Sequence, residues 1–151
     1  MHQNEVYYVH LYSISSTYRV KINKISIKNK KFKITYKPSF AILDTASTDT
    51  YFPNNIYENI INSFNVYCSE IDNCLADTII DANDSRYCFK ISKKISFKKF
   101  INSLPTILIH MGHGNEKVFY WLPKDYLIER FNKEDNGKTY VYHCLGFSGK
   151  K

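Results

Sequence analysis

Apolar and polar residues alternate along the first third of the chain, which is typical of strands with one buried face. The alternation predicts strands over Tyr8 to Ile14, Val20 to Ile27 and Phe32 to Tyr36. Within the second of these, the step from Ile22 to Ile25 breaks the period and predicts a bulge or slip. The run Phe40-Ala41-Ile42-Leu43 is apolar throughout and predicts a short buried strand that ends at Asp44. We therefore expect a meander of strands with the carboxylate of Asp44 at the end of one of them.

The hydrophobic period becomes helical after Phe52-Pro53. One face of the predicted helix carries Ile56, Tyr57, Ile60, Ile61 and Phe64. Asn54 or Asn55 can cap its first turn. The following segment, residues 68–86, is rich in Asp, Asn and Ser, so we expect an irregular surface insertion there.

Strand patterns return in the second half of the chain. They cover Tyr87 to Ile91, Ile95 to Phe97, Thr106 to His110, Lys117 to Leu122 and Tyr140 to Phe147. Gly112 and Gly114 predict a hairpin turn, and the segment from Glu134 to Lys138 predicts another. Pro123 to Phe131 fits a short helix with proline near its start. No repeat or linker divides the sequence, so we expect one domain over residues 1–151.

The size and composition are consistent with a single hydrophobic core. The chain has 151 residues, 44% of them hydrophobic, which is enough to fold one domain. No apolar stretch approaches the length that crosses a bilayer, and the first residues lack the order of a signal peptide. The net charge of +7 raises the alternative of nucleic-acid binding, but the lysines are spread as on a solvated β-surface, so no nucleic acid is expected.

Four cysteines, an Asn-Asp-Ser segment and two histidines are the other candidates for chemistry. Cys68, Cys74, Cys88 and Cys144 form an even set that fits two disulfides or four free thiols. Asn83 begins a weak glycosylation signal. His110 and His113 have no third ligand nearby and sit in a predicted turn, so neither a metal site nor a cofactor is expected.

The segment from Phe40 to Thr48 carries the most specific chemistry, because an apolar strand ends in Asp44 and small or hydroxyl residues follow. Peptide hydrolysis without a metal needs one carboxylate to activate water and a second, protonated carboxyl to donate to the scissile carbonyl. Aspartic proteases are the standard example of two carboxyls that share one proton. Hydroxyl and tiny neighbours suit such a carboxylate, because they hold its oxygens and let backbone amides approach.

Asp44-Thr45-Ala46-Ser47 resembles the D-[ST]-G-[ST] signature of pepsin-like aspartic proteases, and further segments resemble the C-terminal lobe of that family in the same order. They are Tyr7 to Leu11, Phe40 to Pro53, Leu104 to Ile107, Leu122-Pro123 with Tyr126, and Cys144 to Phe147. The resemblance covers nearly the whole chain and is nearest to plasmepsin-type or memapsin-type members. It implies a mainly β lobe, a β-meander and partial barrel with one or two short helices, truncated at its C-terminus.

The resemblance also implies roles for single residues. Asp44 is the expected catalytic carboxylate, Thr45 braces its loop, Ser47 hydrogen-bonds it and Thr48 contacts the substrate. Cys88 pairs with Cys144 by the same resemblance, which leaves Cys68 with Cys74. The implied activity is aspartic endopeptidase, with a peptide or protein substrate and the N-terminal lobe as partner. A secretory or endolysosomal location follows if the parent protein carries a signal peptide.

Two departures from the family pattern limit the implied activity. Ala46 stands where the family has glycine, and its methyl group costs about 1 kcal/mol or more if the turn needs a positive φ. The first D-T-G segment and the closing hydrophobic-hydrophobic-glycine strand have no counterpart in this sequence. We therefore expect the isolated chain to be inactive. The alternatives are a non-catalytic, pseudoprotease-like binding lobe and, more remotely, a basic β-domain that binds nucleic acid.

Overall fold

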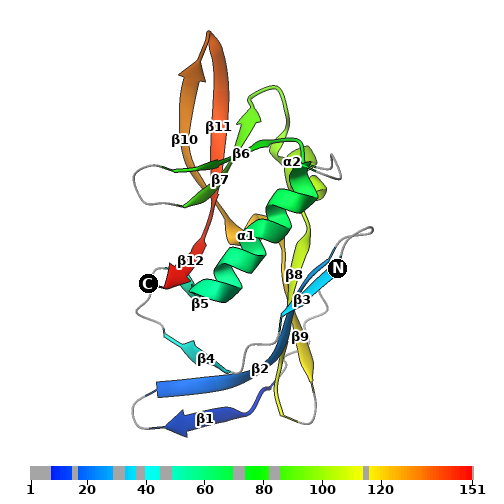
Figure 1. Ribbon diagram of the computed structural model, residues 1–151, viewed down its shortest axis with the longest axis vertical. Coiled ribbons are helices and arrows are strands. Elements are labelled where there is room, and N and C mark those ends of the chain that lie inside the picture. The colour runs from blue at the N-terminus through cyan, green and yellow to red at the C-terminus, as the bar shows by residue number, and fades with distance from the viewer. Residues whose placement is uncertain are drawn as a thin grey trace.

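The computed structural model describes residues 8–14, 17–28, 33–36, 40–44, 49–69, 74–81, 86–113 and 116–150 (Figure 1). The elements, in order, are β1 (Leu11–Ile14), β2 (Thr17–Lys28), β3 (Lys33–Tyr36), β4 (Phe40–Leu43), β5 (Thr50–Pro53), α1 (Asn54–Ser69), β6 (Asp77–Ile80), β7 (Tyr87–Ser92), α2 (Phe97–Ser103), β8 (Thr106–Met111), β9 (Lys117–Trp121), α3 (Pro123–Tyr126), β10 (Leu127–Asp135), β11 (Lys138–Leu145) and β12 (Phe147–Lys150). Strands predominate, which confirms the mainly β prediction.

The largest sheet is built around β2, whose two halves have different neighbours. Its first half pairs with β1 on one side and β4 on the other, and its second half pairs with β3 and β8. β9 continues the sheet beyond β8. The register between β2 and β8 shifts between Ile22 and Lys24, which confirms the predicted bulge. One long strand thereby holds β4, the strand that leads to Asp44, against the body of the sheet.

A second antiparallel sheet has the order β10-β11-β7-β6. The β10–β11 hairpin turns at Asn136 and Gly137, both of which have positive φ. An Asn-Gly pair suits this left-handed turn, because neither residue is strongly disfavoured there. The predicted turn between Glu134 and Lys138 is confirmed.

α1 has sixteen residues and buries the face that the sequence predicted, including Ile60 and Phe64. In Figure 1 it runs obliquely across the molecule, from the β5–β12 pair toward α2. Phe64 contacts the rings of Tyr87, Phe89 and Tyr126, so the helix packs on aromatic residues from the second half of the chain. Among the described residues, no helix is long and apolar enough to cross a membrane.

Three expectations for local structure are corrected. Ile95 to Phe97 is not a strand, because Ser96 caps α2 by accepting a hydrogen bond from the Lys99 amide, and Phe100 is buried one helical turn after the cap. The helix expected over Pro123 to Phe131 ends at Tyr126, where β10 begins pairing with β11. The insertion at 68–86 contains a strand, β6, which pairs with β7.

The predicted last strand is divided at Gly146. β11 ends at Leu145, and β12 then runs parallel to β5. Phe147 is fully buried and contacts the rings of Phe52, Trp121 and Tyr126. The segment after Gly146 therefore closes the core beside the start of α1.

Both disulfides follow the pairing that the family resemblance implies. Cys68 at the end of α1 is joined to Cys74, and Cys88 of β7 is joined to Cys144 directly opposite on β11. Both cysteines of the second bridge are fully buried. Among the described residues there is no free cysteine.

Candidate active site

Asp44 lies immediately after β4, where the pairing of that strand with β2 ends. Leu43, the last residue of β4, is opposite Tyr18, and Asp44 itself is exposed. The predicted order of an apolar strand followed by a carboxylate is present in the fold. Thr45, Ala46, Ser47 and Thr48 lie outside the described residues, as does Asn83.

The expected burial of β4 is wrong for this chain. Phe40, Ile42 and Leu43 are each more than half exposed. Successive residues of a strand point to opposite faces, so exposure of both Ile42 and Leu43 means that neither face of β4 is fully covered. Ala41, opposite the buried Val20 of β2, packs against the core, but most of the core lies around β2, α1, β7 and β12.

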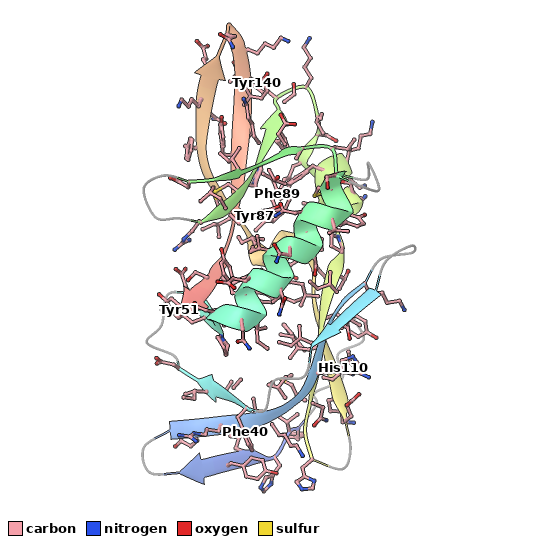
Figure 2. All side chains as sticks on the ribbon, viewed as in Figure 1. Phe40, Tyr51, Tyr87, Phe89, His110 and Tyr140 are labelled. Atoms are coloured by element: carbon pink, nitrogen blue, oxygen red, sulfur yellow. A yellow bond between two sulfur atoms is a disulfide. The ribbon has the colours of Figure 1, made fainter. Side chains whose placement is uncertain are left out.

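Other exposed apolar side chains surround β4. Tyr18 and Leu11 are exposed on the neighbouring strands, and Tyr12 of β1 meets the ring of Phe40 edge-on at 5.6 Å. Figure 2 shows Phe40 at the end of the molecule formed by β1, β2 and β4. We call these exposed residues the β4 surface. The strand register places Leu11, Tyr18 and Leu43 on one face of the sheet, and Phe40 and Ile42 on the other. Clustered exposed apolar residues usually mark an interaction site.

An ion pair anchors the chain just beyond the Asp44 segment. Arg86 donates a hydrogen bond from Nη2 to Oδ2 of Asp49, and both side chains are mostly buried. Asp49 precedes β5, and Arg86 precedes β7 of the other sheet. The pair therefore links the start of β5, which follows the Asp44 segment in the chain, to the start of β7. Sequence reasoning did not single out either residue, since one Asp and one Arg so far apart give no local pattern.

His110 belongs to a polar network on the β8–β9 hairpin. Its Nδ1 lies 2.6 Å from Oε1 of Glu116, and Asn23 of β2 donates to Oε2 of Glu116 at 3.1 Å. The hydrogen bond from His110 is the main cause that lowers the pKa of Glu116. His113 is exposed beyond the end of β8. The network joins β2, β8 and the segment before β9, and sequence reasoning missed Glu116 as its centre.

One cluster of possible metal ligands exists among the described residues. It consists of Asp81, Cys88 and Cys144, whose ligand atoms lie within 4.8 Å of one another. The two sulfur atoms are bonded to each other, so they are not available as thiolate ligands. The cluster is part of the disulfide core and gives no metal-binding chemistry in this state.

The geometry is that of a β-lobe that presents a carboxylate at the end of a paired, apolar strand. Residues 7–151 match the family described as xylanase inhibitor C-terminal. The chain belongs to this family. The xylanase inhibitor C-terminal family is related to the pepsin-like aspartic proteases, and many of its members are inhibitors without catalytic activity. No curated protein and no solved structure matches the chain.

Membership of the xylanase inhibitor C-terminal family agrees with the pepsin-like resemblance of the sequence. It also explains why the resemblance extends along nearly the whole chain, from the first strands to the Cys144 segment. The family includes inhibitors that bind another protein without cleaving it, so membership is compatible with either a catalytic or a non-catalytic Asp44.

Proposed function

We propose that this domain supplies Asp44 as one of the two carboxylates of an aspartic endopeptidase. The observation that carries the proposal is the exposed position of Asp44 at the tip of β4, beside an uncovered apolar surface. The order of segments around Asp44 supports membership of the plasmepsin-type or memapsin-type proteases. In this role Thr45 braces the loop, Ser47 hydrogen-bonds the carboxylate and Thr48 contacts the peptide.

The second carboxylate is proposed to come from a pepsin-like lobe that covers the β4 surface. Covering Phe40 and Ile42, which share one face of β4, removes apolar area from water, which favours association. It also excludes water from the surroundings of Asp44, where two nearby carboxyls then share one proton. The ionised carboxylate takes a proton from the attacking water, and the protonated carboxyl donates its proton to the carbonyl oxygen of the scissile bond.

A peptide-cleavage assay at mildly acid pH tests the proposal. The chain is combined with a pepsin-like lobe that carries its own catalytic Asp, and cleavage of a fluorogenic peptide is followed with and without pepstatin. Asp44→Asn is expected to lower the rate at least about 1,000-fold, because one half of the dyad no longer ionises. Asp77→Asn, an exposed carboxylate on β6, is the matched control and should keep the wild-type rate. Cleavage that survives Asp44→Asn would sink the proposal.

The second candidate is a non-catalytic lobe that binds another protein through the β4 surface. Family membership favours it, because many relatives are inhibitors, and so does Ala46 at the glycine position of the signature. The family description suggests a glycan-degrading enzyme such as a xylanase as the partner.

Restoring the glycine separates the two candidates. If Ala46→Gly turns an inactive two-lobe protein into an active one, the alanine had silenced a protease site. If neither protein cleaves the peptide, and Ile42→Lys abolishes capture of a xylanase, the binding lobe is supported.

A further inference from the structure

Four lysines surround an exposed phenylalanine at the start of α2. Lys93 and Lys94 form the turn after β7, and Lys98 and Lys99 lie in the first turn of the helix. All four are exposed, and Phe97 between the two pairs is 43% exposed. We call these five residues the α2 basic surface.

The four lysines of the α2 basic surface are not neutralised by ion pairs with described residues, although the fold brings Glu134 toward Lys93, whose amide donates to the carbonyl oxygen of Thr139, the residue opposite Glu134. No ion pair joins any of the four lysines to another residue that the structure describes. The sequence has no Asp or Glu between Asp84 and Glu116. The lysines therefore create a local positive potential that adds to the net charge of +7.

Phe97 is held in place rather than free to fold back into the core. Its ring stacks on the ring of His143 at 4.8 Å, and His143 is buried in β11. Ser96 fixes the backbone on the other side through its hydrogen bond from the Lys99 amide at 3.3 Å. The ring is thus held on a packed helix, with Lys98 and Lys99 in the same helical turn and the other two lysines in the turn that precedes it.

We propose that the α2 basic surface binds anionic lipid membranes. Lysines near an anionic leaflet are attracted to it, and an exposed phenylalanine among them can insert at the boundary between headgroups and acyl chains. Single-stranded nucleic-acid sites stack successive bases on several rings, whereas this surface offers one ring with a face already covered by His143. In Figure 1, α2 lies in the half of the molecule away from β1 and β4, so membrane binding leaves the β4 surface open.

Flotation with lipid vesicles tests this proposal on the whole chain. The protein should float with vesicles that contain 30% phosphatidylserine and not with pure phosphatidylcholine, and high salt should release it. Each lysine near such a surface contributes about fivefold in affinity. Replacing Lys93, Lys94, Lys98 and Lys99 with Gln should therefore lower the partition coefficient by about 600-fold.

The matched control removes the same charge from the other end of the molecule. Its substitutions to Gln are at Arg19, Lys21, Lys24 and Lys117, and the partition coefficient should fall less than about fivefold. Phe97→Ser should weaken binding several-fold, and Phe97→Leu, which keeps an apolar side chain on His143, should retain it. Circular dichroism shows whether each variant is folded.

Three results would overturn the proposal. One is equal flotation of the folded lysine variant and its control, and another is equal binding to neutral and anionic vesicles. The third is a protein that does not float with anionic vesicles but retains a single-stranded oligonucleotide or a polyglutamate peptide at physiological salt. That result would assign the surface to another polyanion.

Discussion

Tyr126 is fully buried, and its hydroxyl donates a 2.7 Å hydrogen bond to the carbonyl oxygen of Pro105. Burial raises the pKa of Tyr126 well above its ordinary value of 10. The bond joins α3 to the segment just before β8, so it links two parts of the fold that are distant in sequence.

Tyr126→Phe should lower the free energy of unfolding by about 1–2 kcal/mol, because the buried carbonyl of Pro105 loses its donor. Urea denaturation measures the change. Tyr120→Phe is the matched control, since Tyr120 is more than half exposed and should give no measurable change. Equal midpoints for the two variants would show that the buried hydrogen bond does not contribute.

Tyr87 makes stability depend on alkaline pH. Burial raises the pKa of Tyr87 from 10 to about 12, and its hydroxyl donates to Oδ1 of Asn65 on α1. The folded state therefore prefers the neutral phenol. Stability should be complete below about pH 10 and should fall as the pH rises toward 12, because the unfolded chain ionises first.

Tyr87→Phe should make this alkaline loss of stability less steep, as measured by denaturation midpoints between pH 8 and pH 11.5. The comparison with Tyr120→Phe corrects for general base effects. An identical slope in wild type and Tyr87→Phe would contradict the shifted pKa.

At the scale of elements, β12 depends on close contact with the start of α1. A Cβ atom on Gly149 would lie 2.6 Å from Oδ1 of Asn54 and 3.0 Å from a ring carbon of Tyr57. Both neighbours belong to the first turns of α1, so the helix and the strand pack without room for a methyl group.

Gly149→Ala should therefore destabilise the protein by about 1–3 kcal/mol through overpacking. Gly146→Ala is the control, because a Cβ there meets its neighbours only at 3.6 Å. Thermal denaturation of both variants measures the difference. Asn54→Ala should recover part of the loss in the Gly149→Ala background, and equal melting temperatures for the two alanine variants would contradict the contact.

Elements with a strong period were predictable from the sequence, and elements set by a single cap or partner were not. α1 followed from its apolar face, and the turn between β10 and β11 from Asn136-Gly137, whereas the start of β10 was expected to be helical. Ile95 to Phe97, at the start of α2, was interpreted as a strand because Ile95 and Phe97 favour strands, and the cap by Ser96 outweighed that preference. β6 lies in a polar segment and forms because β7 offers a free edge, which no local pattern reveals.

The same distinction applies to the candidate site. An apolar strand that ends in Asp44 was readable from the residue order, and so was the pepsin-like resemblance that family membership supports. The exposure of β4 could not be read from the sequence. A hydrophobic strand is expected to be covered, but its residues do not say whether the same chain or another chain covers it. The Asp49–Arg86 pair was also beyond reach, since only the fold brings those residues together.

At the scale of the whole molecule, two surfaces of opposite character lie in different halves. The β4 surface is apolar and lies next to Asp44, whereas the α2 basic surface is positive. We propose a protein partner for the first and an anionic lipid surface for the second. The two proposals are independent, because the substitutions that test one leave the residues of the other unchanged.

The central claim is that Asp44 is half of a carboxylate dyad, and the pH–rate profile of peptide cleavage by the two-lobe protein tests it most directly. Two carboxyls that share a proton titrate as a pair, so the rate should pass through a maximum at acid pH and fall on both sides. Asp44→Asn should abolish this maximum, and Asp77→Asn should leave it in place. A rate that rises steadily toward neutral pH and is the same in both variants would contradict the account.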